Sequence, residues 1–281
     1  MLEPPCGPGH SHPMDAITEL ELRCADAWPA LVDERLGQWR LRAAGGFTGR
    51  ANSALTTGDP GVPMPEALAT IAAFAARNGI NPAAHVTQGS ETERRIREAD
   101  WSLAEDHPGG AVATVLTGPL PDGETQGEVL DKPSPQWWEL AVGEPTAAQR
   151  HVLGTGPLLG FGHVEGAAVV RGCIVDSTLH ISRLSVRPEL RRQGTARRLM
   201  AALGTWARDR GAQGAVLQVA VHNEAAIRLY EGLGFTEHHR YAYWRPRPFS
   251  SCRCDERHRR YGTGGRRCWA WPSRSRRRPG P

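Results

Sequence analysis

Apolar residues recur with strand and helix periods in two stretches of the chain, and each stretch predicts the same succession of elements. The later stretch alternates strands and helices at 179–186, 195–210, 215–221 and 223–233. The earlier stretch predicts a helix that begins at Pro65, then a strand, a helix and a strand, at 65–78, 84–86, 92–99 and 111–116. This order of elements, from 51 to 116 and again from 179 to 244, indicates an α/β fold with an internal repeat.

The segments outside the repeat give weaker periods. Residues 16–36 predict helical pieces broken around Trp28 and Pro29, and 39–46 predicts a strand that runs into a glycine turn. Residues 119–135 are rich in proline and glycine and predict a linker. The domain prediction is a disordered leader, a first module, a linker, a second module and a disordered tail, at 1–14, 15–118, 119–136, 137–246 and 247–281.

The richest chemistry of the later stretch lies where its first strand passes into its long helix. The segment there reads Arg191-Arg192-Gln193-Gly194-Thr195-Ala196. Backbone N–H groups at a helix start lack partners and face a positive dipole end, while glycine lets the main chain approach a phosphate. The segment predicts an anion site, with an ordinary helix start as the alternative.

Two signatures in this order resemble the GNAT superfamily of N-acetyltransferases. The first is Arg-x-x-Gly-x-Ala at 191–196, and the second is Asn-x-x-Ala-x-x-x-Tyr at 223–230, followed by Leu-Gly-Phe at 233–235. The resemblance implies a mixed α/β (α+β) sheet flanked by helices and splayed beside the first signature, in two tandem GNAT-like modules. The first module is degenerate, because prolines and Asp59 occupy its equivalent loop at 58–65 and prolines carry no N–H for a phosphate.

The resemblance also implies the residues that bind acetyl-CoA as co-substrate. Backbone groups would bind the pantetheine arm and the pyrophosphate, arginines would add charge, and Asn223 would contact the pantetheine or cap its helix. These residues are Leu184, Ser185, Val186, Arg191, Arg192, Gln193, Gly194, Thr195, Ala196, Arg197 and Asn223. Tyr230 would be the general acid that protonates the departing thiolate, the alternative being a packed core tyrosine.

The general base is less well marked, because the strand at 179–186 has no carboxylate. His180 stands where histone-type members have a glutamate and is the candidate base, with a surface histidine as the alternative. His163 and Glu165 compete for the same role. Glu237, His238 and His239 lie on the last predicted strand, where alternation with the tyrosines suggests an exposed, structural face.

A glycine-rich cluster at 45–53 is the densest polar point of the earlier stretch. Arg50 and Asn52 could reach across to a substrate carboxylate or carbonyl. The alternative, which the composition favours, is a glycine turn in which Asn52 and Ser53 cap local backbone groups.

Charge and cysteine content limit the other classes of function. The eleven arginines from 246 onward, set against Asp255 and Glu256, carry +9 of a chain whose net charge is +4, which leaves −5 for the rest and a slight bias toward a cationic acceptor. The cationic end is an incidental extension or an arm for nucleic acid, the latter being the less favoured. The set Cys252, Cys254, His258 and Cys268 matches no common zinc module, so no metal is predicted, and Cys24 and Cys173 are ordinary core residues.

The sequence therefore predicts a cytoplasmic enzyme that moves acetyl from acetyl-CoA to a primary amine of a small molecule or peptide, by direct transfer in a ternary complex. No apolar run is long enough to span a membrane, and no secretory signal is present. A non-catalytic acyl-CoA sensor or scaffold is the alternative, because no strand carboxylate is available as the base.

Overall fold

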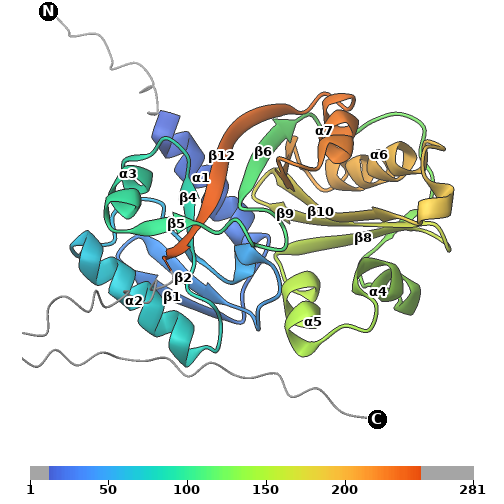
Figure 1. The fold of residues 1–281 in the computed structure, drawn as a ribbon. Helices are drawn as coiled ribbons and strands as arrows, with labels where there is room; N and C mark the ends of the chain where they lie inside the picture. The colour runs from blue at the N-terminus through green and yellow to red at the C-terminus, as the bar shows by residue number, and fades with distance from the viewer. Residues whose placement is uncertain (1–12, 248–281) are drawn as a thin grey trace, which may run out of the picture. The chain divides into compact units, whose positions relative to one another are not determined.

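A single twelve-stranded sheet unites the two stretches in the computed structural model, which describes residues 13–247 (Figure 1). The strands are β1 (Val32–Leu36), β2 (Trp39–Ala43), β3 (Ala54–Leu55), β4 (Ala84–Thr87), β5 (Trp101–Leu103), β6 (Val112–Gly118), β7 (Glu128–Leu130), β8 (Leu158–Val164), β9 (Ala168–Val175), β10 (Thr178–Val186), β11 (Gly214–Ala220) and β12 (Thr236–Pro246). The helices are α1 (Pro13–Asp26), α2 (Met64–Arg77), α3 (Glu91–Glu98), α4 (Pro135–Val142), α5 (Ala147–Gly154), α6 (Thr195–Arg208) and α7 (Glu224–Glu231), with 3₁₀ turns η1 (Gly49–Ala51) and η2 (Pro188–Leu190).

The two halves of the sheet repeat one pattern of strand pairing. In the first half, β1, β2 and β3 are antiparallel neighbours and β3 runs parallel to β4. In the second half, β8, β9 and β10 are antiparallel neighbours and β10 runs parallel to β11. A helix connects each parallel pair, α2 in the first half and α6 in the second. The expected mixed sheet flanked by helices is therefore confirmed.

The last strand of each half pairs within the other half. β6, from the first stretch, lies between β11 and β12, while β12, from the end of the second stretch, lies between β4 and β6 (Figure 1). The segment 119–136 is more than a connection, because it contains β7, which pairs with β8. The division into tandem modules stays a prediction, and the two halves share one sheet by exchanging strands.

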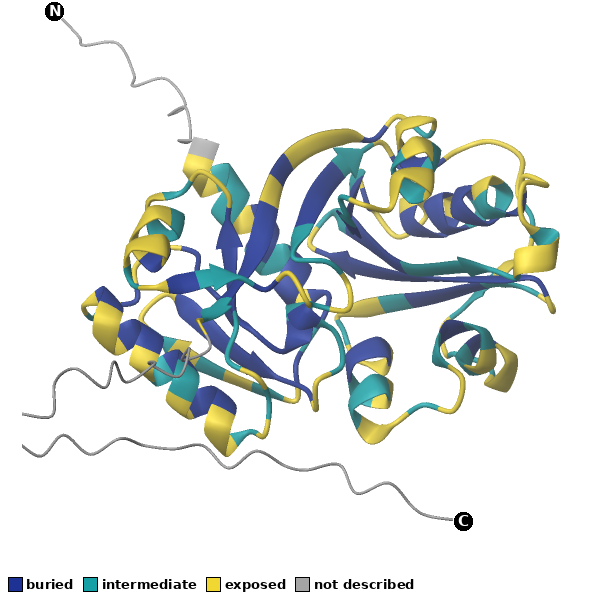
Figure 2. Ribbon diagram, viewed as in Figure 1, coloured by how far each residue is buried: buried dark blue, intermediate teal, exposed yellow. Residues whose placement is uncertain are grey.

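Helices cover both faces of the sheet, and the central strands between them are mostly buried (Figure 2). Ala168 and Val170 of β9 join the core under α6, whereas Val169 between them packs with Trp137 of α4. In the first half, Ala242 and Trp244 of β12 pack with α2 residues. β9 is buried at every position, on both faces of the sheet, which explains its long apolar run.

The predicted repeat elements lie within two residues of the observed ones, and the predicted helix before Trp28 is present, but residues 32–36 form a strand and not the predicted helical piece. A continuous α1 ends at Asp26 and is followed by β1, which pairs with β2 across a Gly37 turn with φ 55°. β1 alternates polar and apolar residues only weakly, so its pairing with β2 decides its conformation rather than its own sequence. Within residues 13–247, no helix combines the length and the apolar character that crossing a membrane requires.

Candidate functional site

β10 and β11 pair for only part of their length and then separate. Their register runs from Thr178↔Gly214 to Ile181↔Leu217 and stops there, although β10 continues to Val186. On its other side, β10 is irregular between Ser182 and Ser185, where Arg183 has φ 56°. This bulge turns the end of β10 away from β11. The predicted splay is therefore present, and Leu184, Ser185 and Val186 lie beyond the point of separation.

The start of α6 lies at the open end of this splay. Gly194 is the N-cap residue with φ 79°, and Arg192 also has positive φ, at 65°. No side chain caps this helix end, so the N–H groups of its first turn point outward as donors. The first turn of α6 contains no acidic residue. The local geometry is that of a helix-terminal anion site.

A cavity of about 1240 Å³ lies between the splayed strands and the starts of α6 and α7. Ten of the eleven residues predicted to bind the co-substrate line it, and Gln193 is the exception. These ten are Leu184, Ser185, Val186, Arg191, Arg192, Gly194, Thr195, Ala196, Arg197 and Asn223. Residues predicted from two separate signatures thus converge on one cavity.

Tyr230 lines the same cavity from the last turn of α7 and is 9% exposed. Burial raises the pKa of its phenol to about 12, and the positive charge of Arg50 opposes that rise only in part. The hydroxyl therefore stays protonated throughout the neutral range. Asn223 begins the same helix and caps it, because its side chain accepts a hydrogen bond of 3.3 Å from the Ala226 N–H.

His180 lies beside this cavity rather than in it. It is 1% exposed, lies between Trp28 and the β11 strand, and does not line this cavity. Burial lowers the pKa of its imidazole to about 3, helped by the charges of Arg50 and Arg171. The geometry gives His180 no contact with a bound amine, and so weak a base would hold little of a proton near neutral pH.

The two competing candidates for the base are also remote from the cavity. His163 on β8 lies 3.7 Å from Glu128 of β7, between Nε2 and Oε1. Glu165 is exposed in the turn after β8. Neither side chain lines the cavity.

Asn52 and Arg50 of the glycine-rich cluster at 45–53 have different surroundings. Asn52 is buried and bonded only to local backbone: its Oδ1 accepts from the N–H groups of Ala44 and Gly46, and its Nδ2 donates to Phe47 and Thr48. Arg50 instead reaches the second half of the sheet. Its Nη1 donates to Gln218 Oε1 of β11 at 3.4 Å, and its guanidinium lies 4.6 Å from the centre of the Trp28 ring.

A second cavity, of about 390 Å³, adjoins the first on the side of the first half. The two cavities share four lining residues, Arg50, Gly109, Gln218 and Ala220. Its remaining walls come from the 46–49 turn, the 107–110 loop, and Ala113, Tyr241 and Tyr243 of the sheet. The first half thus contributes one side of a continuous space whose other side is the splay.

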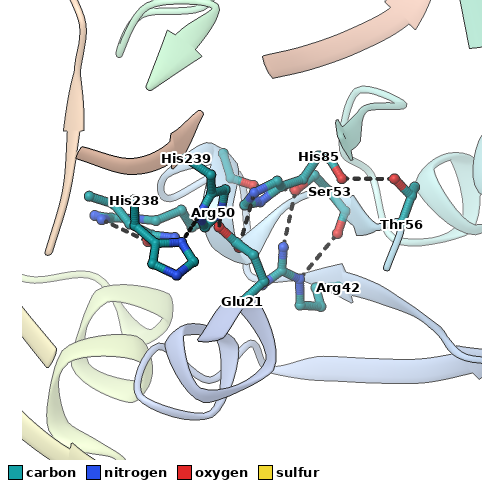
Figure 3. A network of polar contacts seen from close by, with 10 residues as sticks. Glu21, Arg42, Arg50, Ser53, Thr56, His85, His238 and His239 are labelled. Carbon is teal, nitrogen blue, oxygen red and sulfur yellow. Dashed lines mark hydrogen bonds and ion pairs between the residues drawn. The ribbon is translucent and has the colours of Figure 1, made fainter. Parts of the chain in front are cut away.

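A buried polar network that was not predicted joins Glu21 of α1 with His85 and His239 of the sheet (Figure 3). The Glu21 carboxylate of α1 lies 2.9 Å from His239 Nε2 and 3.2 Å from His85 Nε2, with all three side chains buried. Burial alone would raise the pKa of Glu21, but the two imidazoles outweigh it and hold that pKa well below its usual range. His85 in turn lies against Tyr241, with 3.7 Å between ring centres.

The prediction that His239 lies on an exposed face was wrong. His239, Tyr241 and Tyr243 alternate onto one face of β12, and that face is covered by α1. The alternation along β12 carries no sign that α1, far away in the sequence, packs against this face. A helix residue 218 positions away in sequence supplies the carboxylate that makes a buried histidine tolerable.

Of the cysteines named in the predictions, the described residues include Cys24 and Cys173. Cys24 and Cys173 are buried free thiols, as expected for core residues. The set Cys252, Cys254, His258 and Cys268 lies outside the described residues, as do the predicted leader up to 12 and nearly all of the tail. Among residues 13–247, no three histidine, cysteine or acidic side chains converge as a metal site would require.

A mixed sheet that splays beside an uncapped helix start defines the GNAT fold, and comparisons with known proteins agree. A GCN5-related N-acetyltransferase from Kribbella flavida superposes with a TM-score of 0.60 at 16% identity, over 85% of this chain and 97% of that one. The model of the family described as "Probable histone acetyltransferase Rv0428c C-terminal" matches residues 15–244, so the chain belongs to that family of GNAT-type acetyltransferases.

Two curated relatives extend this result. The "Probable histone acetyltransferase Rv0428c" of Mycobacterium tuberculosis is 30% identical over 241 residues, 81% of this chain and 73% of that protein. The "Uncharacterized N-acetyltransferase YobR" of Bacillus subtilis is 24% identical over 253 residues, 80% of this chain and 98% of that protein. The family model, which matches residues 15–244, spans both halves of the sheet.

Proposed function

We propose that this acetyltransferase takes acetyl from acetyl-CoA and transfers it directly to a primary amine bound between the two halves of the sheet. The observation that carries the proposal is the convergence of the β10–β11 splay, the uncapped start of α6 and Tyr230 on one cavity. Acetyl-CoA supplies the activated acetyl thioester. The chain supplies the groups that orient both substrates, positive charge and a proton donor.

The residues present suit the two chemically distinct parts of acetyl-CoA. The pyrophosphate needs N–H donors and positive charge, and the start of α6 offers both, with Arg191, Arg192 and Arg197 alongside. The pantetheine needs a strand edge for its amides, and β10 beyond Ile181 has one unpaired edge. The Ser182 hydroxyl, buried in this cavity wall without a protein partner, is a further polar group for the same arm.

The transfer balances without an external co-reactant. The uncharged amine forms the C–N bond at the thioester carbon, the C–S bond breaks, and the proton lost by the amine nitrogen ends on the thiol. We assign the Tyr230 hydroxyl to donate a proton to the sulfur as the bond breaks and to recover one afterwards. No carboxylate or accessible histidine of the described chain lines the cavity of about 1240 Å³ beside the start of α6, which we call the α6 cavity. We therefore propose that the amine binds in its neutral form.

The first test is binding of acetyl-CoA measured by titration calorimetry in Gly194→Ala, with Gly211→Ala as the matched control. Both glycines have positive φ, at 79° and 84°, and flank the same helix, but only Gly194 lines the cavity. An added methyl at Gly194 would also lie 2.7 Å from Arg198 Nη1, whereas nothing lies within 4 Å at Gly211. We expect about tenfold weaker binding in Gly194→Ala alone. Equal affinities in the two variants would refute the assignment of the pyrophosphate site.

The second test separates catalysis from binding through Tyr230→Phe. Thiol release from acetyl-CoA is followed against a panel of amino acids, polyamines, aminoglycosides and short peptides. We expect kcat to fall about a hundredfold with acetyl-CoA affinity within twofold of the wild type, because only the proton donor is lost. Unchanged kcat would remove Tyr230 from the mechanism. Tight acetyl-CoA binding without thiol release for any amine would favour the alternative, an acyl-CoA sensor.

A further inference from the structure

The smaller cavity and the guanidinium of Arg50, which lines both cavities, indicate which amine is accepted. This inference rests on the proposed function. Arg50 lies where the two cavities meet, with Trp28 and Gln218 as its contacts. It forms no ion pair with any carboxylate of residues 13–247. A guanidinium placed over an aromatic ring and held by one long hydrogen bond retains most of its donors for a ligand.

A second guanidinium lies on the same side of the cavity. Arg183, at the bulge of β10, donates to the Ala141 carbonyl, and its Nε is buried without a partner in the described structure. Burial, and then the charge of Arg50, lower the pKa of Arg183. Two like charges that act on one another and have no counter-ion create a positive potential at the point where the acetyl group is transferred.

The lining of both cavities lacks the opposite charge. Among the residues that line them in the described chain there is no aspartate and no glutamate. A polyamine or a lysine side chain would find no carboxylate here and would be repelled by Arg50. The overall acidity of the chain before 246 therefore does not extend into the site, and it does not select a cationic acceptor.

The size and walls of the smaller cavity suit a compact ligand. Its volume of about 390 Å³ lies near the lower end of the range for small-molecule sites. Phe47, Tyr241 and a stacked pair, His107 on Tyr243 with ring centres 4.6 Å apart, provide the flat apolar surface. The Gly109 N–H donates to His107 Nδ1 at 3.1 Å, so the neutral ring carries its proton on Nε2 and is a donor there.

We infer that the acceptor is a small amine that also carries a carboxylate, an amino acid rather than a polyamine or a long peptide. Arg50 binds the carboxylate, as a fork of parallel N–H donors fits two carboxylate oxygens. The aromatic walls receive the side chain, and the amine is left on the side of the α6 cavity. Arg50 is a binding residue in this assignment and takes no part in proton transfer.

The test compares three forms of each acceptor in the thiol-release assay: a free amino acid, its amide and its decarboxylated amine. Phenylalanine, phenylalaninamide and phenethylamine form one such set, and alanine, alaninamide and ethylamine another. We expect kcat/KM for the free acid to exceed that for the other two by at least about tenfold. A preference for the decarboxylated amine or for spermidine would overturn the inference while leaving the acetyltransferase activity established.

Arg50→Gln supplies the decisive variant, with Arg35→Gln of the exposed β1 strand as the matched control. We expect the preference for acid over amide to collapse to about one in Arg50→Gln, to recover in part in Arg50→Lys, and to stay as in the wild type in Arg35→Gln. A preference that survives Arg50→Gln would overturn the inference. Circular dichroism and acetyl-CoA titration verify that each variant is folded and binds the co-substrate.

Direct calorimetry of phenylalanine binding separates this inference from the proposed function. If no amine releases thiol but phenylalanine binds the wild type and not Arg50→Gln, the proposed function fails and the carboxylate site stands. If thiol is released from amines while phenylalanine neither binds nor reacts, the proposed function stands and the carboxylate site is refuted.

Discussion

The helices α2 and α6 occupy equivalent places in the two halves, yet they begin in opposite ways. Each follows the first strand of a parallel pair, β3 or β10. α2 has Pro63 as its N-cap, Pro65 in its first turn and Glu66 beside it. α6 has Gly194 as its N-cap and no proline or acidic residue in its first turn. The start of α2 thus lacks two donors and carries a negative charge, whereas the start of α6 offers donors beside arginines.

This difference separates what the fold fixes from what the site requires. Strand order and connection are alike in both halves, so topology alone does not make an anion site. β3 has two residues and β10 has nine, and only the longer strand extends past its parallel partner to leave an open edge. A co-substrate cavity arises where a long splayed strand and an uncapped helix start occur together.

The largest expected effect concerns the buried arginines of the central strands, Arg42 on β2 and Arg171 on β9. Arg171 donates to three carbonyls, those of Leu153, Ala27 and Thr155, at 2.7 to 3.0 Å, whereas Arg42 donates only to Ser53. We expect Arg171→Met to lower the free energy of unfolding by about 4 kcal/mol, because three buried carbonyls lose their donors. Arg42→Met should cost about half as much. Urea denaturation of both variants checks the order, and an equal or larger loss in Arg42→Met would contradict it.

The buried histidines of the two halves should respond differently to acid. Burial lowers the pKa of both imidazoles, but the Glu21 carboxylate opposes the fall at His85, whereas the charges of Arg50 and Arg171 add to it at His180, whose pKa falls to about 3. Between that value and 6.5 the unfolded chain binds the proton and the folded chain does not, so this stability is lost as pH falls below about 6.5. From pH 7 to pH 5, His180→Leu should lose about 2 kcal/mol less than the wild type. Denaturation at both pH values measures the difference, and parallel losses in the two proteins would disprove it.

A proline at the second residue of α6 would make the start of this helix resemble the start of α2. Ala196 is the second residue of α6, as Pro65 is the second of α2. Ala196→Pro removes one N–H donor from the cavity at a position where helices tolerate proline. Acetyl-CoA affinity should fall about tenfold while the melting temperature stays within a few degrees. Wild-type affinity in a folded variant would show that this N–H does not contact the ligand.

The smallest expected effect concerns Arg197, an exposed side chain near the start of α6 whose Nη1 donates to the Gly232 carbonyl at 2.8 Å. Arg197→Met should weaken acetyl-CoA binding about threefold at low salt and less at high salt, as expected for an exposed, screened charge. Arg208→Met, at the other end of α6, is the control and should bind like the wild type. A loss that does not depend on ionic strength would indicate a packing defect instead.

The sequence was most informative where chemistry and local periodicity coincide. The α6 loop and the α7 signature were found through their resemblance to the GNAT superfamily, and ten of the eleven residues that it assigned to the co-substrate line one cavity. His180 was misleading because a strand residue's exposure depends on which helices cover the strand, and α1 with the Trp28 segment covers that region. The sequence indicated Arg50 as a candidate but not its position beside β11, because its contact with Gln218 spans 168 residues. Periodicity within a window carries no information about contacts at that range.

The exchange of β6 and β12 has a consequence for how the chain acquires its structure during synthesis. β4 is complete in the growing polypeptide long before its neighbour β12, which enters the sheet through Tyr241↔Thr87 and the pairs beside it. Until then β4 is an open edge of the first half of the sheet, of the kind that pairs wrongly with other strands. The last strand therefore closes the first half, and a chain that ends before 236 would leave the β4 edge without its partner.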